Sequence, residues 1–321
     1  MKFKTTLEPK QTEINVSYSD KLFFIGSCFS ENIGKKLANL KFQTSINPFG
    51  IIYNPISIFE VLDSIVSHKK YSSENIFKHN DIWKCFDFHS DISAIDADAL
   101  LSKINYKIEE ANTFLKQSNV LFITFGTSWV YKNNEEKIVA NCHKIPQKKF
   151  TKVLLDDNTI IAAFKKTYKQ IKSINPNINI VLSISPVRHI RDGIVENNQS
   201  KAQLISATHK LVSEFNNVHY FPAFEYIIDD LRDYRFFKAD LVHPNELAIQ
   251  YVFEKFELTY INEATLLKKK AIEKVLKSLN HKVLFKETDA YKLFKNKLIK
   301  QIEILQNDGF DFLNEVKNLN S

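Results

Sequence analysis

Glycine is scarce in this chain, with 6 residues among 321, and methionine and tryptophan are rarer still, with 1 and 2. Glycine adopts left-handed backbone conformations at no steric cost, so a chain that uses it sparingly places it where a tight turn needs it. No internal repeat or low-complexity segment is present. Four of the six glycines, Gly26, Gly34, Gly50 and Gly126, lie within the short motifs described below.

Cysteine is also rare, and its spacing excludes two classes of site. Cys28, Cys85 and Cys142 lie far apart, are odd in number and form no CxxC or CxxH pair. This pattern predicts neither a disulfide framework nor a zinc site. We expect a reducing, cytoplasmic setting.

Long apolar runs are missing. No segment reaches the roughly 18–20 apolar residues that span a bilayer, and residues 1–6 lack the apolar core of a signal segment. The formal net charge of +7 comes largely from lysines near the C-terminus. Because no recognised nucleic-acid module accompanies them, we interpret these lysines as a solvated helical face and expect no nucleic-acid partner.

Apolar runs and amphipathic helical patterns alternate along the chain. Strands are predicted at 22–25, 42–46, 120–125, 178–184 and 219–221. Helices are predicted at 31–40, 55–67, 106–117, 155–174, 200–215 and 245–258. This alternation predicts an α/β fold with a central parallel sheet between two helical layers, a three-layer α/β/α arrangement. The segments near 76–101 and 129–150 are predicted to be insertions at the sheet edge.

The pattern changes after the last of these helices. From about Thr265 the chain is rich in lysine and amphipathic, and a second helix is predicted at 290–306. We therefore expect an α/β domain over 1–258 and a helical extension over 259–321. The extension fits a hairpin that is either docked on the domain or used for self-association into a homo-oligomer.

The tripeptide Gly26-Ser27-Cys28 lies between the first predicted strand and the first predicted helix. A strand, a tight glycine turn and a helix N-terminus can expose one side chain as a nucleophile. The free N–H groups at the helix start would favour a thiolate or an oxyanion there. An ordinary strand–helix junction would leave the same pattern.

The segment Asp240-Leu241-Val242-His243-Pro244 supplies a candidate partner. A catalytic histidine needs an acceptor on its second ring nitrogen, and an aspartate three residues earlier can provide one within a single turn. Pro244 suits the start of the helix that follows. A capping aspartate and a surface histidine are the alternative.

These motifs resemble those of the GSCFA domain family. The resemblance covers roughly residues 3–258 and includes Phe24–Gly34, where Ser30 stands in place of the alanine of the family's name. It continues through six further segments: 47–55, 125–131, 140–144, 185–189, 233–237 and 240–244. The family is grouped with the SGNH/GDSL-like hydrolases, so the resemblance implies their fold and a site of their kind rather than a particular substrate.

The resemblance also implies roles for individual residues. Laid over the Gly-Asp-Ser of GDSL enzymes, Cys28 falls on the nucleophile, and Ser27 becomes the nucleophile only if the turn is offset by one residue. Alternatively, Cys28 is a packed structural residue and Ser27 caps the helix. A thiol at a helix N-terminus near a histidine is expected to have a lowered pKa. His243 would act as general base and acid, and Asp240 would orient it.

The oxyanion hole is expected from the backbone N–H groups of Cys28 and Gly50 together with a side chain. Ser128 stands where the SGNH pattern has an asparagine, and its hydroxyl is shorter and less fixed than an amide. Asn47 and Asn141 are candidate replacements, although either could simply form a turn.

Substrate contacts are expected from polar residues that follow apolar segments, namely His143, Arg188 and His189. Arg188 and Arg191 could hold an anionic or sugar-bearing substrate, or could pair with Asp192 or Glu196.

Together these interpretations favour an esterase or acyltransferase that acts on a small O-acyl ester, such as an O-acetylated carbohydrate, through a covalent acyl-enzyme. No metal or cofactor is implied, although a transferase would need an acyl donor. The alternative is a non-catalytic carbohydrate-binding or scaffold protein that keeps the fold.

Overall fold

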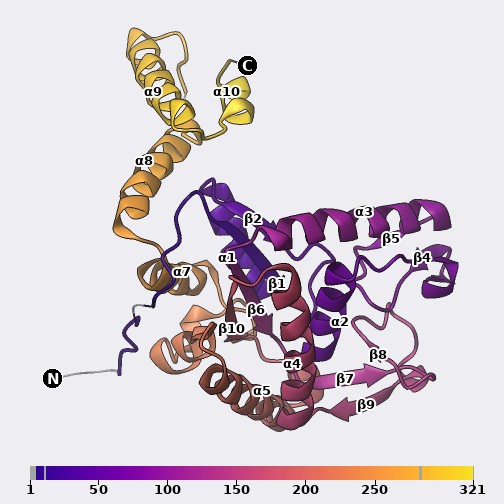
Figure 1. Ribbon diagram of the computed structural model, residues 1–321. Coiled ribbons are helices and arrows are strands. Elements are labelled where there is room, and N and C mark those ends of the chain that lie inside the picture. The colour runs from indigo at the N-terminus through magenta and orange to yellow at the C-terminus, as the bar shows by residue number, and fades with distance from the viewer. Residues whose placement is uncertain (1–4, 11, 282–283, 321) are drawn as a thin grey trace.

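Five parallel strands form the central sheet of the computed structural model, which describes residues 5–10, 12–281 and 284–320 (Figure 1). They are β1 (Lys21–Gly26), β2 (Gln43–Ile46), β6 (Val120–Phe125), β10 (Asn179–Ile184) and β11 (Val218–Phe221). The order across the sheet is β11-β10-β6-β1-β2. All five predicted strands are confirmed. Because the strand order reverses at β1, the carboxyl end of β1 opens on the crevice where α/β sheets bind ligands.

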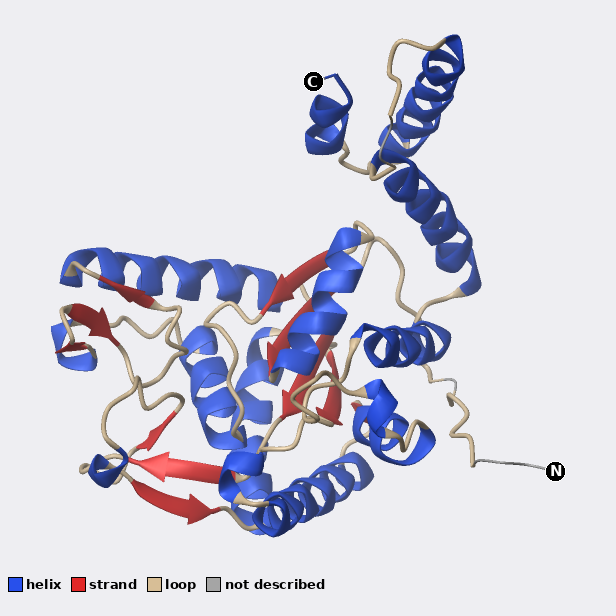
Figure 2. Ribbon diagram, turned by 180° about the vertical axis from the view of Figure 1, so that it is seen from behind, coloured by secondary structure: helices blue, strands red, loops and turns tan. Residues whose placement is uncertain are grey.

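Helices cover both faces of this sheet, as Figure 2 shows from behind. Side chains alternate along β1, so Phe23 and Ile25 pack with α2 (Pro55–Val66), α3 (Ala97–Lys116), α4 (Asp157–Ile174) and α5 (Ile194–Glu214). Leu22 and Phe24 pack on the other side with α1 (Cys28–Asn39) and α7 (Glu246–Tyr260). A short helix, α6 (Ala223–Glu225), follows β11. The predicted three-layer α/β/α fold is confirmed.

Two small antiparallel sheets lie beside the main one. The first contains β3 (Phe77–His79), β4 (Ile82–Lys84) and β5 (Ser93–Ala94), and the second contains β7 (Trp129–Lys132), β8 (Ile138–Val139) and β9 (Thr151–Leu154). The predicted insertion boundaries need correction at two ends. Residues 97–101 belong to α3, because Asp96 caps that helix, and residues 151–154 pair with β7.

Several helices begin earlier than the apolar periodicity predicts. Helix α1 starts at Cys28 instead of residue 31, since Ser27 and not Ser30 is the N-cap. Helices α3 and α5 also start before the predicted residues 106 and 200, at Ala97 and Ile194. The first turns of α3 and α5 are largely exposed, so the apolar spacing that marks a buried helical face begins only further along these two helices.

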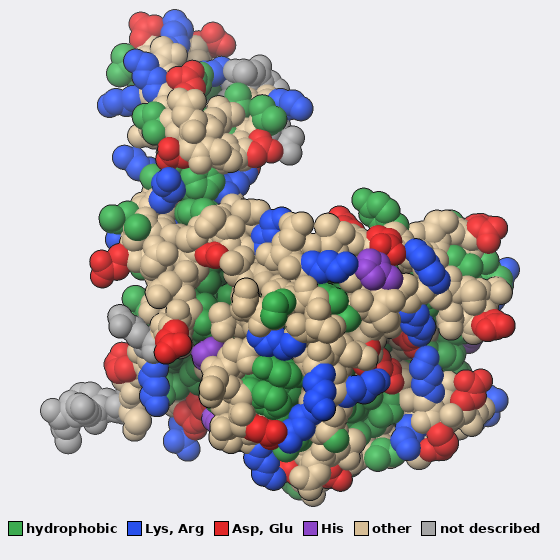
Figure 3. Space-filling view, viewed as in Figure 1, with side chains coloured by type: hydrophobic (Ala, Val, Ile, Leu, Met, Phe, Trp, Pro, Cys, Tyr) green, Lys and Arg blue, Asp and Glu red, His purple; other side chains and the backbone are tan. Residues whose placement is uncertain are grey.

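The C-terminal helices project from the α/β body (Figure 1). They are α8 (Glu263–Leu279), α9 (Asp289–Asn307) and α10 (Leu313–Asn320), the last of which the sequence did not predict. Helices α8 and α9 pack through Ile272, Val275, Leu298 and Ile302. Figure 3 shows charged side chains of both signs over this arm, in keeping with a solvated face. Its use in self-association stays a prediction.

The Lys269–Glu257 ion pair at 2.6 Å joins α8 to α7, and an aromatic contact area also holds the arm to the body. The Tyr18 ring stacks on Phe42 at 4.2 Å and meets Phe310 edge-on at 4.7 Å. Next to it, Lys41 pairs with Glu315 and lies 4.8 Å from the centre of the Phe312 ring. Among the residues that the structure describes, no helix is long and apolar enough to cross a membrane.

Candidate active site at the carboxyl ends of the strands

Cys28 is the first residue of α1 and directly follows the glycine turn at the end of β1. Gly26 has a φ of +127°, and a Cβ there would lie 2.2 Å from the Thr124 carbonyl oxygen, so only glycine fits. The Ser27 N–H donates to that same oxygen at 3.0 Å. The turn therefore packs closely against β6 and places Cys28 at the carboxyl end of β1.

The structure gives Ser27 and Cys28 different surroundings. The Ser27 side chain accepts the Phe29 N–H at 3.2 Å as the N-cap of α1, and the residue is 1% exposed. Cys28 is partly exposed and forms no disulfide. Of the two candidate nucleophiles, Cys28 is the one that a substrate can reach.

The thiol is not activated in the way that the helix N-terminus suggests. Burial raises the pKa of Cys28, and the nearby Glu31 carboxylate raises it further. The backbone N–H of Cys28 and the charges of Lys201 and Lys238 act in the opposite direction but do not prevail. The expected lowered pKa is thus contradicted, since desolvation disfavours the thiolate more than the helix terminus stabilises it. A resting thiol here needs a base.

Asp240 and His243 are joined within one tight loop before α7. The Asp240 Oδ1 atom accepts the N–H groups of Val242 at 2.9 Å and His243 at 3.0 Å. His243 Nδ1–H donates to Asp240 Oδ2 at 2.8 Å. These bonds, led by that of the His243 N–H, lower the pKa of Asp240 to about 2. The carboxylate therefore stays ionised and fixes the histidine tautomer.

The loop itself is anchored on both sides. The Lys238 N–H donates to the His243 carbonyl oxygen at 2.7 Å, and Phe237 and Pro244 form an antiparallel bridge. His243 Nε2 has no hydrogen-bond partner among the described residues, and it does not bond to Cys28. Lys238 lies close enough for its charge to act on the Cys28 thiol, so this loop and the glycine turn face a common region.

Asn47 follows β2 and lies beside the glycine turn. Its N–H donates to the Phe24 carbonyl oxygen and its Oδ1 accepts the Gly26 N–H, both at 2.9 Å. The residue is 8% exposed, and its buried Nδ2 has no acceptor among the residues that the structure describes. An unpaired buried donor of this kind is costly, which makes it a candidate to receive a developing negative charge.

The other two expected oxyanion donors are already engaged, which corrects their assignment. The Gly50 N–H donates to the Asn47 carbonyl oxygen at 2.8 Å in a tight turn. Ser128 is fully buried; its N–H donates to Ser200 Oγ at 2.7 Å and its hydroxyl donates to the Ser200 carbonyl oxygen at 3.2 Å. Neither group is free to meet an oxyanion.

His143 packs inside the insertions instead of facing a substrate. The residue is 1% exposed, and its Nε2–H donates to the Cys85 carbonyl oxygen at 2.7 Å. Burial lowers its pKa to about 4, so the ring is neutral. Asn141 is also engaged, because its Oδ1 accepts the His143 N–H at 2.7 Å. The substrate-binding role expected of His143 does not fit this position.

Arg188 and His189 do lie at the carboxyl end of β10. The His189 ring meets Tyr53 edge-on at 5.2 Å, and burial lowers its pKa to about 4. Its buried Nε2 has no hydrogen-bond partner within residues 5–10, 12–281 and 284–320. Arg188 is half-buried and has no ion pair with any described residue. The ion pair with Asp192 considered above is not formed, since Lys152 takes that carboxylate.

Lys201 is a buried charged residue that the sequence patterns did not predict. It lies on α5, is 2% exposed, and its Nζ donates to the Gly126 and Ser185 carbonyl oxygens at 2.6 Å each. Its position three residues before Leu204 places it on the buried stripe of the helix, and this spacing is the signal that could have revealed it.

Two family models match this chain, and one of them covers the whole candidate site. The model of the GSCFA family matches residues 21–256, and that of the GSCFA domain protein, C-terminal domain, matches residues 272–321. The chain belongs to the GSCFA family. Cys28, Asn47, Lys201 and His243 all lie within the GSCFA match. Among curated proteins, none matches this sequence.

Two solved structures show a distant likeness to this GSCFA chain. A carbohydrate esterase family 3 protein from Talaromyces cellulolyticus has 7% identity and a TM-score of 0.35, over 78% of this chain and 99% of its own. An acetyl xylan esterase from the rumen bacterium Butyrivibrio proteoclasticus has 12% identity and a TM-score of 0.37, over 75% of this chain and 63% of its own. At these scores neither likeness says what the GSCFA chain acts on.

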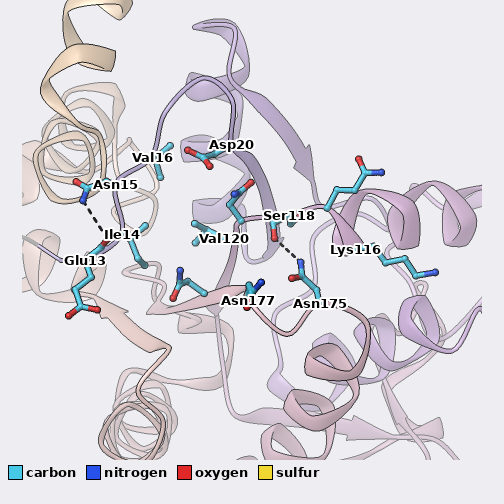
Figure 4. A pocket seen from close by; sticks show the side chains of 13 residues that line it. Glu13, Ile14, Asn15, Val16, Asp20, Lys116, Ser118, Val120, Asn175 and Asn177 are labelled. Carbon is cyan, nitrogen blue, oxygen red and sulfur yellow. Dashed lines mark hydrogen bonds between the residues drawn. The ribbon is translucent and has the colours of Figure 1, made fainter.

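A cavity of about 320 Å³ lies at the opposite end of the GSCFA sheet (Figure 4). It is lined by residues at or just before the amino ends of β1, β6 and β10, among them Asp20, Val120 and Asn179. No predicted site residue lines it. The described residues contain no cluster of side chains suited to hold a metal ion.

Proposed function

We propose that this protein hydrolyses or transfers a small O-acyl group through a covalent thioester on Cys28. The observation that carries the proposal is the hydrogen bond from His243 Nδ1–H to the ionised Asp240, which leaves Nε2 free as a base. The charge of Lys238, whose backbone binds that of His243, acts on the Cys28 thiol and so links the two halves of the site.

The chemistry follows from these positions. His243 Nε2 takes the thiol proton as Sγ attacks the ester carbonyl carbon, and the carbonyl oxygen becomes an oxyanion. When the intermediate collapses, the alkoxide leaves with the proton from His243, and a thioester remains. Water or an acceptor hydroxyl then gives its proton to His243 and attacks the thioester, which releases Cys28 as the thiol.

Two donors suit the oxyanion. The Cys28 N–H is at the start of α1, where backbone N–H groups lack helical acceptors, and Asn47 Nδ2 is buried and unpaired. This assignment replaces Gly50 and Ser128 with a single amide that Gly26 holds in place. Cys28 needs no preformed thiolate in this scheme, because the base removes the proton during attack.

Turnover of p-nitrophenyl acetate, with and without a sugar acceptor, tests the proposal. We expect acetate release to water or acetyl transfer to the sugar, and an acetyl adduct on Cys28 by mass spectrometry after rapid quenching. Cys28→Ala should abolish both, and Ser27→Ala, which removes only the helix cap, should keep them.

A second function has specific support. The missing Cys28–His243 hydrogen bond and the engaged Ser128 hydroxyl would suit a carbohydrate-binding or scaffold protein without chemistry. The same experiment separates the two. If no activated ester is turned over and no adduct forms on Cys28, the catalytic proposal is wrong and the non-catalytic one is favoured.

A further inference from the structure

Lys201 places an ammonium group inside the protein without a carboxylate partner. Its Nζ lies between the Gly126 and Ser185 carbonyl oxygens, at 2.6 Å from each, where β6 and β10 end. No acidic side chain among the described residues pairs with it. Buried lysines are normally paired or neutral, because an isolated charge is costly to desolvate. Hydrogen bonding between two strand ends does not by itself require a titratable side chain at this position.

The end of β6 holds both Lys201 and the turn that carries the nucleophile. The Ser27 N–H donates to the Thr124 carbonyl oxygen at 3.0 Å, and Lys201 Nζ donates to the carbonyl oxygen of Gly126, two residues further along. Burial lowers the pKa of Lys201 to about 7, while Cys28 raises it and Arg188 lowers it. The influence is mutual, since the Lys201 charge lowers the pKa of the Cys28 thiol. Lys201 does not hydrogen-bond to Cys28, so it acts on the thiol through space.

The other charged groups around the thiol are few. Glu31 on α1 raises its pKa, and the exposed Lys238 beside the His243 loop lowers it. Burial raises the pKa of Tyr53, and the charges of Cys28 and Glu31 raise it further. Of the two cations, only Lys201 is shielded from water, where a charge acts over a longer range than it does in solvent.

We propose that Lys201 is a positioning residue that ties the carboxyl ends of β6 and β10 together and sets a buried positive charge behind Cys28, so that negative charge on the sulfur is favoured. The ammonium form supplies the attraction and the neutral amine does not. The inference rests on the proposed function only in making Cys28 the reacting atom, because the sulfur can be titrated without any ester.

The first test is the pH dependence of Cys28 alkylation by iodoacetamide, followed by peptide mass spectrometry. Lys201→Met should alkylate about ten-fold more slowly than the wild type at pH 6, which corresponds to about one unit in the thiol pKa. At pH 10 the wild-type lysine is neutral, and the two rates should converge. Lys210→Met is the matched control on the same helix, exposed and paired with Asp157, and should follow the wild type throughout.

A merely structural role would not give this pH pattern. If Lys201→Met folds and its rate relative to the wild type is the same at pH 6 and pH 10, the proposal is wrong. Ester turnover plays no part in the measurement, so an inactive protein could still show the coupling and an active one could lack it.

The second test leaves Lys201 in place, in case Lys201→Met fails to fold. Cys28 is modified with iodoacetate or with iodoacetamide in a Cys142→Ser background, which gives adducts of similar size with and without a negative charge. Lysine side-chain NMR then follows the titration of Lys201, whose pKa is about 7. Its midpoint should be higher by about one unit with the carboxymethyl adduct than with the neutral adduct. Equal midpoints would overturn the proposal.

Discussion

The side-chain amide of Asn47 is held at its oxygen: Oδ1 accepts the Gly26 N–H at 2.9 Å, whereas the buried Nδ2 finds no acceptor in the described part of the chain. The same glycine forms the turn before Cys28. A donor fixed in this way needs no reorganisation when negative charge develops beside it, which is the property expected of an oxyanion hole.

Asn47→Asp tests that role. The substitution keeps the acceptor for Gly26 and tolerates the φ of 41° at this position, but it removes the donor. We expect kcat for p-nitrophenyl acetate to fall by about 10²–10³-fold, with little change in KM. Ser128→Ala is the matched control, because its hydroxyl serves Ser200; it should cost about 0.5–1.5 kcal/mol of stability and leave kcat within about two-fold. A larger kcat loss in Ser128→Ala than in Asn47→Asp would reverse the assignment.

Asp240→Asn probes the histidine tautomer. The asparagine oxygen can still accept the Val242 and His243 N–H groups, but its NH₂ would face His243 Nδ1 and favour the opposite tautomer. We expect kcat/KM to fall by on the order of 10³–10⁴-fold, with an unchanged circular dichroism spectrum. Asp233→Asn, which alters the cap of the preceding turn and its ion pair with Arg235, should retain activity. Full activity in Asp240→Asn would remove Asp240 from the mechanism.

Cysteine labelling at neutral pH should follow exposure and pKa. Cys85 is buried and its pKa is raised to about 12, whereas burial raises that of the partly exposed Cys142 to about 11. We expect iodoacetamide to label Cys28 first, then Cys142 and last Cys85, at a rate for Cys28 that falls in His243→Ala. A serine-directed fluorophosphonate should not modify the capped Ser27. Its attachment to Ser27, with Cys28 inert, would exchange the two roles.

Lys201 also predicts how stability changes with pH. Its folded-state pKa of about 7 is below the roughly 10.4 of an unfolded lysine, so between these values the unfolded chain holds a proton that the native state has released. The free energy of unfolding should therefore rise with pH across this window. Lys201→Met should lack that rise and Lys210→Met should retain it, in urea unfolding at pH 6.5, 8.5 and 10. Parallel slopes in all three proteins would show that Lys201 is not perturbed.

The sequence predicted the sheet well for a physical reason. Central parallel strands are covered on both faces, so β1, β6 and β10 are nearly continuous apolar runs that stand out from the helices between them. Helix starts were predicted less well, because the first turns of α3 and α5 are largely exposed and the start of α1 depends on its cap, Ser27.

In the candidate site, contacts between residues close in sequence could be predicted, and contacts between distant residues could not. The Asp240–His243 contact lies within four residues, so spacing alone could predict it. Spacing could not predict the hydrogen-bond partners of the other residues. Ser128 and His143 bond to Ser200 and Cys85, which are distant in sequence, and the partner of Gly50 depends on the shape of a turn. Burial, which raises the Cys28 pKa and places Lys201, is likewise a property of the packed fold.

The aromatic contact between the arm and the body has a consequence for shortened chains. Tyr18 lies against both Phe42 of the body and Phe310 of the arm, and Lys41 reaches both Glu315 and Phe312. A chain that ends near residue 258 would bare one face of Tyr18 and leave Lys41 without its acid. Such a fragment would expose apolar surface beside the edge strand β2. Any loss of solubility or any aggregation of the fragment would then result from the missing arm and not from a defect in the candidate active site.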